Sequence, residues 1–342
     1  MKKLKLCIVG AGKIFENFHL RAINSTNLYN IVGVVDKNER RLNEIKNNYN
    51  LPIFHSVDEI VEADLCFIAT PPNIRKAVIL PAISKGMNIV CEKPFTYTSE
   101  EAKIFIAEAD KKGKRIFVTQ TRRLFPNILI LKELIESGSI ANLKEVKMIE
   151  GGLYGWESVG TERAEIFEKD FGILNDVGAH LVDAITFLFD VQSVEIERSV
   201  FDYDLGANNV SALLNVTIGG NNVFPIVLKI SRDQNLFNYI QIETKKSIIK
   251  TKSLLSENVK IYDNNRSELF VGSENYPKTM EDVFEMIWRQ VYDEINNNNT
   301  MGFSLNAKTV IQSIKLIEKI AVSRQVVKFD DYYNNEVWNG NN

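Results

Sequence analysis

The sequence predicts an α/β Rossmann domain with a doubly wound parallel sheet, followed by an α+β domain with a large, mainly antiparallel open sheet. Three observations lead to this fold class. Short apolar runs alternate with helix-like segments over about the first third of the chain, strand-like runs follow one another directly after about residue 140, and 342 residues exceed what one hydrophobic core usually serves. We expect a first domain over residues 1–122, a second over 123–324 and a C-terminal tail over 325–342.

The expected elements of the first domain alternate between strand and helix. The opening βαβ unit has strands at 4–10 and 31–36 around a helix at about 14–24. Ser56 and Glu59 have the spacing of a capping box, which marks a helix start. Further strands are expected at 64–70, 88–94 and 115–120. Because these runs are nearly continuously apolar, helices should cover both faces of a parallel sheet.

The second domain is recognised by strict alternation of apolar residues. This pattern runs through 209–218, breaks at a turn over 219–222 and resumes through 223–231, which predicts a hairpin. The helices expected to cover one face of this sheet lie at 172–190, about 280–296 and about 304–323. The other face also needs cover, which predicts a homodimer or homotetramer formed through this sheet.

Composition limits the class of protein. Hydrophobic residues make up 45%, charged residues 25%, and the net charge is −3, so no basic field for nucleic acid is present. No apolar stretch approaches the roughly 20 residues of a membrane span, and Gly10, Gly12 and Lys13 interrupt the N-terminal apolar run too early for a signal peptide. We therefore expect a cytoplasmic protein with neither a nucleic-acid nor a membrane partner.

The cysteines and histidines do not have the spacing of a metal site. Each of the three cysteines, Cys7, Cys66 and Cys91, lies in a short apolar run, which is typical of small core residues in a reducing compartment. No C-x-x-C motif occurs, and none of the three histidines is grouped with a cysteine. We predict no metal.

The run CIVGAGKIFENFH at residues 7–19 has the first half of a phosphate-binding fingerprint. Gly10 and Gly12 allow a tight turn and a close approach to a pyrophosphate, and Asp36 ends the second strand, where a carboxylate accepts hydrogen bonds from ribose hydroxyls. Because a carboxylate repels a 2′-phosphate, this arrangement favours NAD over NADP, although Lys37 and Arg40 nearby can soften the preference. The alternative is an ordinary turn glycine and a strand-end aspartate.

Several motifs together resemble the Gfo/Idh/MocA oxidoreductases, which include glucose–fructose oxidoreductase and inositol dehydrogenase. The most specific string is ATPPNIRKAVILPAISKGMNIVCEKPF, in which Glu92-Lys93-Pro94 matches the EKP motif of the family. VTQTRRLFP is similar to the segment entering the second domain, residues 176–180 are similar to the D-x-x-x-H signature, and SLNAKTVIQSIKLIEKIAVSR looks like the closing helix. The resemblance thus spans nearly the whole chain.

The residues of these motifs also suit hydride chemistry on their own. Asp176 and His180 are four residues apart, so on a helix they share a face, and a carboxylate can orient an imidazole that acts as acid or base. Lys93 follows a strand at its carboxyl end, where open α/β sheets bind ligands, and its ammonium can donate to a substrate hydroxyl. The alternatives are a buried structural histidine, a helix-start aspartate and a surface lysine held by Glu92.

The resemblance implies Lys93 and His180 near the reacting carbon, with Asp176 assisting and Pro94 shaping the turn beside the nicotinamide. The sequence departs from the family at Phe15, which stands in place of the third small residue, and at Arg75, where many members have histidine. We expect Phe15 either to hold its helix away from the sheet or to turn outward and wall the nicotinamide pocket. The residues expected to contact the cofactor are Gly10, Gly12, Lys13, Ile14, Asp36, Ala69, Thr70, Pro71, Glu92 and Lys93.

The expected substrate is a sugar, a nucleotide sugar or a cyclitol, bound between the two domains. Arg122, Tyr154, Trp156 and Arg163 are the candidates for contacting it, because arginines suit phosphates or carboxylates and aromatic faces suit sugar rings. They are equally consistent with domain packing. Two other functions stay open: a non-catalytic sensor, like the galactose-pathway co-repressor of the same family, and a redox-neutral glycosidase that uses bound NAD.

Overall fold

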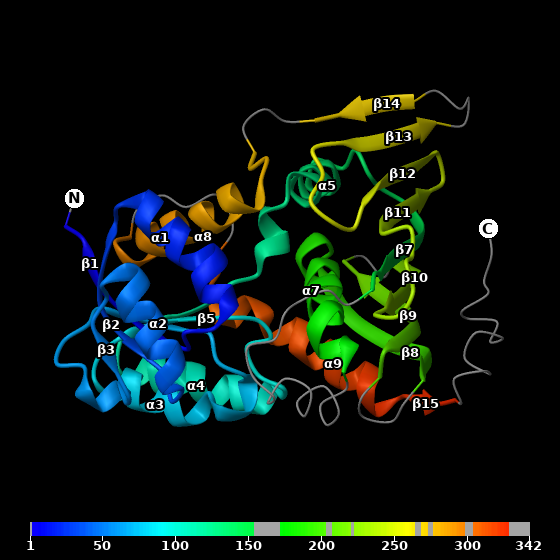
Figure 1. The fold of residues 1–342 in the computed structure, drawn as a ribbon. Coiled ribbons are helices and arrows are strands. Elements are labelled where there is room, and N and C mark those ends of the chain that lie inside the picture. Colours follow the sequence, from blue (N-terminus) through cyan, green and yellow to red (C-terminus); the bar gives the residue numbers. More distant parts are fainter. Residues whose placement is uncertain are drawn as a thin grey trace. The chain divides into compact units, whose positions relative to one another are not determined.

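The computed structural model describes residues 2–153, 172–202, 207–219, 222–263, 268–272, 276–297 and 304–327 (Figure 1). The chain divides into two compact units. The first unit comprises Met1–Thr121 and Thr279–Ile311, and the second comprises Arg122–Lys278 and Gln312–Asn342. The division near residue 121 lies beside the expected boundary at 122, whereas the return of residues 279–311 to the first unit differs from the expected organisation.

The first unit is built on a six-stranded parallel sheet in the order β3-β2-β1-β4-β5-β6, which confirms the predicted Rossmann architecture. Its strands are β1 (Leu4–Val9), β2 (Tyr29–Val35), β3 (Ile53–Phe54), β4 (Leu65–Ile68), β5 (Asn88–Cys91) and β6 (Ile116–Val118). The chain order reverses between β1 and β4. In open α/β sheets, such a reversal opens a crevice at the carboxyl ends of the two strands, where ligands bind.

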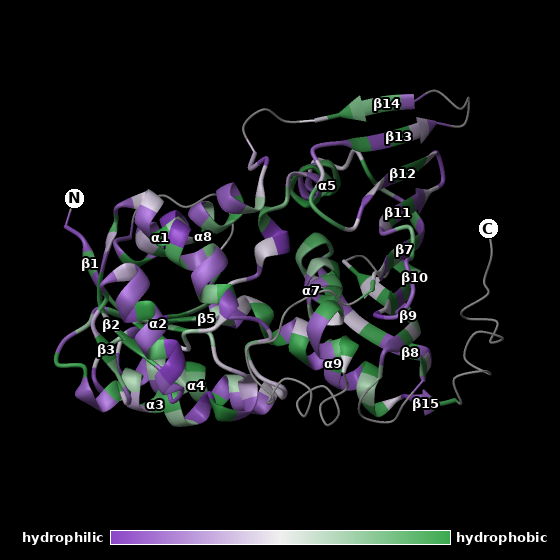
Figure 2. Ribbon diagram, viewed as in Figure 1, coloured by the Kyte–Doolittle hydropathy of each residue, from purple (hydrophilic) through white to green (hydrophobic). Residues whose placement is uncertain are grey.

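Helices cover both faces of this sheet. They are η1 (Phe15–His19), α1 (Leu20–Thr26), α2 (Glu39–Tyr49), η2 (Val57–Glu59), η3 (Pro72–Ile74), α3 (Lys76–Ser84), α4 (Ser99–Lys111), α8 (Met280–Ile295) and η6 (Ala307–Val310). The predicted capping box is present: the Ser56 side chain accepts a hydrogen bond from the backbone of the first turn of η2, and the Glu59 carboxylate accepts one from the backbone N–H of Ser56. In Figure 2, hydrophobic and hydrophilic residues alternate along the helices.

Helix α8 belongs to the first unit, although we expected it to cover the antiparallel sheet. Figure 1 shows α8 alongside α1. Its apolar face buries Phe284, Ile287, Trp288 and Val291, and the hydroxyl of Tyr29 on β2 donates to the Trp288 carbonyl at 2.6 Å. The amphipathic pattern correctly indicates that α8 has a buried face. That face packs on elements that are far away in the sequence.

The second unit is built on a nine-stranded sheet in the order β14-β13-β12-β11-β7-β10-β9-β8-β15. Among the described strands of this sheet, only β7–β10 and β8–β15 pair in parallel, so the prediction of a large, mainly antiparallel sheet is confirmed. The predicted hairpin joins β9 to β10, with Ile218 opposite Asn222. The strands of the nine-stranded sheet are β7 (Leu143–Gly151), β8 (Val191–Phe201), β9 (Asn209–Ile218), β10 (Asn222–Ser231), β11 (Tyr239–Thr244), β12 (Ser247–Lys252), β13 (Val259–Asp263), β14 (Glu268–Val271) and β15 (Gln325–Val326).

Helices pack on one face of the second sheet. They are α5 (Pro126–Glu136), η5 (Leu174–Gly178), α7 (Ala179–Leu188) and α9 (Ile311–Val322), and η4 (Thr121–Leu124) joins the two units. The Ser199 hydroxyl on β8 donates to the Ile320 carbonyl on α9 at 3.1 Å, which ties that helix to the sheet. No helix among the described residues is both long and apolar enough to cross a membrane.

The three cysteines lie in the central strands of the first sheet. Cys7, Cys66 and Cys91 are buried free thiols on β1, β4 and β5. Burial raises the pKa of the Cys91 thiol to about 11, which keeps it protonated and inert. These residues therefore act as small core side chains.

Candidate functional site

The glycine turn after β1 has two glycines with different requirements. Gly10 has a φ of 101°, and a Cβ at this position would lie 2.9 Å from the Ala69 carbonyl carbon, so packing and backbone conformation both demand glycine. A Cβ on Gly12 would meet nothing within 4 Å. Packing within the protein therefore does not explain Gly12, but the close approach of a cofactor pyrophosphate does, so the turn fits a dinucleotide.

The peptide of Ala11, between the two glycines, is held on both sides. Asp36 accepts the Ala11 N–H at 2.7 Å, and Arg41 donates to the Ala11 carbonyl from Nε at 3.0 Å and from Nη2 at 2.7 Å. Asp36 also accepts the Asn38 N–H at 2.8 Å and remains half-buried. Each carboxylate oxygen has a second lone pair, so Asp36 can still accept bonds from a ribose hydroxyl.

Arg41 connects the glycine turn to the start of the following helix. Its guanidinium is buried and lies 3.0 Å from Glu16, which also accepts from Lys13 at 3.1 Å and from the Tyr49 hydroxyl at 3.1 Å. Burial opposes the charge on Glu16, but the hydrogen bonds from Lys13 and Arg41 outweigh it and lower the pKa of this carboxyl. Sequence reasoning missed both Arg41 and Glu16.

Phe15 turns inward and is fully buried, so it does not wall the pocket from outside. It begins η1, a π-helix in which the Leu20 N–H donates to the Phe15 carbonyl. A π-turn is wider than an α-turn because it bonds to the fifth residue along the chain. The aromatic ring is thus accommodated at the third small position by a local change of helix type.

The segment after β4 borders the glycine turn. The Ala69 N–H donates to the Val9 carbonyl at 2.8 Å, which extends the pairing of β1 with β4. Thr70 Oγ1 is buried and has no hydrogen-bond partner among the described residues, and its Cγ2 would lie 3.2 Å from a Cβ on Gly10. A buried hydroxyl that needs a partner beside the glycine turn fits a polar cofactor group at this edge of the sheet.

Arg75, the second departure from the family pattern, joins this segment to the EKP turn. It is 2% exposed, and its Nε donates to the Thr70 carbonyl at 2.9 Å. Its Nη1 donates to the carbonyl of Phe95 at 3.1 Å and to that of Pro94. The guanidinium therefore fixes two loops relative to each other at the carboxyl ends of β4 and β5.

The EKP turn follows β5, and its glutamate is buried. Glu92 accepts the Lys93 N–H at 3.1 Å and lies 2.8 Å from His19 Nε2, whereas Lys93 is half-buried. The Lys93–Pro94 peptide bond, which sequence alone leaves undecided, is cis. Sequence reasoning considered His19 only as a metal ligand, because no local spacing connects it to a glutamate 73 residues later.

In the second unit, Asp176 and His180 follow each other on consecutive helices. Asp176 lies in η5 and His180 in the first turn of α7, and both are half-buried. Asp176 forms an ion pair with Arg232 at 3.0 Å. The sequence did not indicate this partner, because Arg232 lies just beyond β10.

Arg122 is buried and engaged within the second unit. Its guanidinium forms a bidentate pair with Glu150, in which Nη2 lies 2.6 Å from Oε1, and Nη1 donates to the Ser253 carbonyl at 2.8 Å. Tyr154, Trp156 and Arg163 lie outside the described residues. The substrate-contacting role of these four residues therefore stays a prediction.

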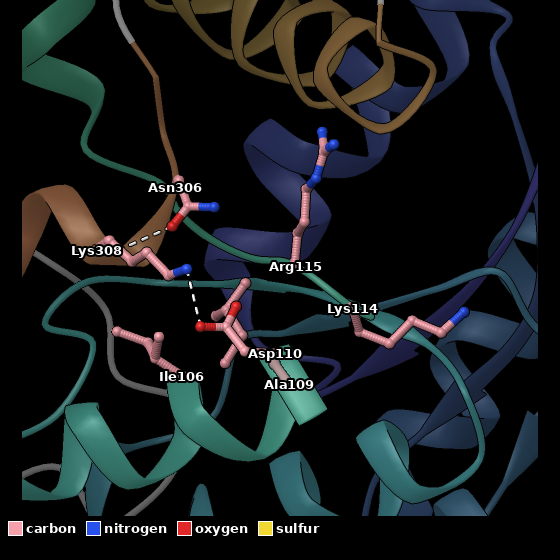
Figure 3. A pocket seen from close by; sticks show the side chains of 8 residues that line it. Ile106, Ala109, Asp110, Lys114, Arg115, Asn306 and Lys308 are labelled. Atoms are coloured by element: carbon pink, nitrogen blue, oxygen red, sulfur yellow. Dashed lines mark hydrogen bonds and ion pairs between the residues drawn. The ribbon is translucent and has the colours of Figure 1, made fainter. Parts of the chain in front are cut away.

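A pocket between α4, the strand end at β6 and η6 is distinct from this site. Figure 3 shows both apolar side chains, such as Ile106, and polar ones around it, with Lys308 paired to Asp110 at 2.8 Å. Its volume of about 10 Å³ leaves room for one water molecule. Among the described residues, no group of three or more His, Cys, Asp or Glu side chains is arranged to hold a metal ion.

Comparison with known proteins agrees with this geometry. Residues 4–120 match the model of an oxidoreductase family with an NAD-binding Rossmann fold. The chain is 28% identical over 194 residues to the glucose-6-phosphate 3-dehydrogenase of Bacillus subtilis strain 168, a match that covers 54% of each chain. The chain spans about half the length of the curated relatives that it matches first.

Solved structures share the fold over nearly the whole chain. A 3-ketoreductase from Actinomadura kijaniata, in complex with NADP and TDP-benzene, has a TM-score of 0.79 at 13% identity and covers 96% of this chain and 100% of its own. A dehydrogenase from Bordetella pertussis, in complex with NADH and UDP-GlcNAcA, has a TM-score of 0.76 at 18% identity and covers 94% and 95%. At these identities the likeness establishes the fold alone.

Proposed function

Because residues 4–120 match the model of an oxidoreductase family with an NAD-binding Rossmann fold, we propose that this protein is a nicotinamide-dependent dehydrogenase or ketoreductase of the Gfo/Idh/MocA type. The observation that carries the proposal is the glycine turn at the β1–β4 switch point, where the Ala11 peptide is fixed by Asp36 and Arg41 and Gly12 has open space beside it. The first unit binds the cofactor and the second binds the substrate.

NAD is the proposed cofactor. The Asp36 carboxylate follows β2 and would repel a 2′-phosphate, and the buried guanidinium of Arg41 is already bonded to Ala11 and Glu16. Gly10, Gly12, Lys13, Ile14, Asp36, Ala69, Thr70, Pro71, Glu92 and Lys93 are the residues proposed to surround it. When bound, the nicotinamide ring supplies a hydride acceptor or donor.

The substrate proposed is a sugar, a nucleotide sugar or a cyclitol with a secondary hydroxyl. His180 removes the hydroxyl proton as a general base, Asp176 orients the imidazole, and the Lys93 ammonium donates a hydrogen bond to the same oxygen. Arg122, Tyr154, Trp156 and Arg163 are proposed to contact the rest of the substrate. Phe15 was the one feature that favoured a non-catalytic sensor, and its burial in the core removes that argument.

Two properties of the whole protein belong to the same proposal. The face of the second sheet opposite α7 and α9 serves homodimer or homotetramer formation. The reduced, buried state of Cys7, Cys66 and Cys91 suits a cytoplasmic protein.

A titration followed by a substrate screen tests the proposal. NADH should bind more tightly than NADPH, and a panel of sugar phosphates, nucleotide sugars and inositols with NAD should produce NADH. His180→Ala should abolish turnover and leave NADH binding intact. Product formation without net NADH would instead point to redox-neutral chemistry, and failure to bind either nucleotide would refute the proposal.

A further inference from the structure

His19 is a fully buried histidine that the proposed chemistry does not use. Its ring lies among three aromatic side chains, with centroid distances of 4.3 Å to Phe67, 4.7 Å to Phe284 and 5.8 Å to Trp288. These rings come from β4 and α8, whereas His19 itself ends η1. Elements from both ends of the chain thus enclose one imidazole inside the first unit.

The hydrogen bonds of His19 determine which ring nitrogen carries the proton. Trp288 Nε1 lies 3.1 Å from His19 Nδ1, and an indole N–H can only donate. His19 Nδ1 is therefore the acceptor, and the ring proton is on Nε2. That nitrogen lies 2.8 Å from Glu92 Oε1, so the imidazole donates to the carboxylate.

Glu92 connects His19 to the backbone of the EKP turn. Its other oxygen, Oε2, accepts the Lys93 N–H at 3.1 Å. Burial alone would raise the pKa of Glu92, but the hydrogen bond from His19, with one from Thr119 and the charge of Lys93, lowers it. The carboxylate thus stays ionised and accepts a bond on each side.

We propose that Trp288 and His19 are positioning residues, which fix the Glu92 carboxylate and through it hold the Lys93 backbone in place. The proposal rests on the proposed function in one respect, namely that Lys93 contacts the substrate. Its structural part stands independently, because it concerns a tautomer and a backbone hydrogen bond in the first unit. The competing interpretation is a buried histidine that serves packing alone.

Three variants and one control separate the two interpretations. Trp288→Phe keeps a ring in the aromatic enclosure but deletes the indole N–H. His19→Gln retains an amide donor for Glu92, whereas His19→Leu retains none. Tyr292→Phe is the matched control, because it removes one hydrogen bond from the same helix, to the Lys2 carbonyl at 2.9 Å, with no connection to Glu92.

The first measurement is the tautomer of His19 by ¹⁵N NMR of the full-length protein. The chain has three histidines, so the ring signal is assignable by its loss in His19→Gln. Wild type and Tyr292→Phe should have the proton on Nε2, and Trp288→Phe should keep it there but shift the Nδ1 resonance, because that nitrogen loses its hydrogen-bond donor. A wild-type ring protonated on Nδ1 alone would overturn the proposal.

The second measurement is hydrogen exchange of the Lys93 amide, compared with the Ile89 amide, which donates to the Arg115 carbonyl within the sheet. His19→Leu should speed exchange at Lys93 by about tenfold or more, because a bond to a charged acceptor is weakened, and should leave Ile89 unchanged. His19→Gln and the control should resemble wild type. If the Lys93 amide stays protected from exchange in His19→Leu, the positioning role is wrong. Should the leucine variant not fold, Trp288→Phe takes its place in the same test.

Turnover provides a third measurement that separates this proposal from the proposed function. With an active substrate, His19→Leu should lower kcat by roughly 10-fold to 100-fold with little change in KM for NAD, and His19→Gln should recover most of the rate. An equal loss in His19→Gln and Tyr292→Phe would indicate packing alone. Absence of turnover in wild type, with the NMR and exchange results as expected, would refute the proposed reaction and leave the positioning of Lys93 established.

Discussion

The two glycines of the turn are required for different reasons, although the sequence motif does not distinguish them. Gly10 is fixed by its positive φ and by the nearby Ala69 carbonyl, whereas Gly12 faces open space. Ala11 contributes only its peptide, which Asp36 and Arg41 hold from opposite sides. Protein groups thus satisfy both backbone polar groups of Ala11.

The two glycines should therefore respond differently to alanine. Gly10→Ala should lower the free energy of unfolding by about 1–3 kcal/mol or more, because the methyl group meets backbone and the φ is strained. Gly12→Ala should stay within about 0.5 kcal/mol of wild type but bind NADH more weakly. Urea denaturation and NADH fluorescence measure the two effects, and equal destabilisation by both changes would contradict this account.

The charge on Glu16 makes the same region sensitive to acid. The folded-state pKa of Glu16 is lowered from 4.5, so its ionisation stabilises the fold above pH 4.5, and this contribution is lost as the pH falls through the folded-state value. Glu16→Gln should cost about 1–3 kcal/mol at pH 7. The difference from wild type in urea midpoints should shrink on acidification, and a constant difference down to pH 3 would argue against the pair with Arg41.

Elements show where sequence patterns suffice and where they do not. Five strands of the first sheet, the capping box at Ser56 and the hairpin at Ile218–Asn222 are local features, so periodicity and turn chemistry predicted them, whereas the two-residue β3 was too short to show a period. Helix α8 is equally periodic, but a pattern gives only the apolar face of a helix, not the surface that it meets. The π-turn at Phe15 was missed for a related reason, because the motif expects a small residue there.

The location of α8 can be tested by paired core substitutions. Ile287→Ala on α8 and Ile320→Ala on α9 both truncate fully buried side chains and should each cost about 2–5 kcal/mol. Hydrogen exchange should increase in β1 and α1 for the first, and in β8 and β9 for the second. Faster exchange in the antiparallel sheet caused by Ile287→Ala would mean that α8 packs elsewhere.

At the scale of the whole molecule, the candidate site shows how far a sequence can lead. The motifs indicated Gly10, Asp36 and the EKP turn, because their chemistry is encoded in short strings. The partners that hold these residues, Arg41 and His19 among them, come from contacts formed only on folding. Arg122 illustrates the same limit, because its partner Glu150 is 28 residues away on β7.

Cofactor binding should stabilise the two units unequally. A ligand that binds only the folded state adds about 2.7 kcal/mol at a concentration of 100 times its Kd. NADH should therefore slow hydrogen exchange in β1, β4 and α8 of the first unit more than in β9 and β10 of the second. NADPH at the same concentration is the control, and equal protection of both units by NADH would contradict binding at the glycine turn.

The return of residues 279–311 to the first unit has a consequence for synthesis on the ribosome. The parallel sheet emerges first, but the indole that encloses His19 is translated only after strands β7 to β14 of the antiparallel sheet. At 5–20 residues per second, the nascent Rossmann strands wait on the order of 10 to 30 s for α8. During that interval the face that α8 will cover is exposed, so the growing chain offers chaperones a defined apolar surface that the finished protein hides.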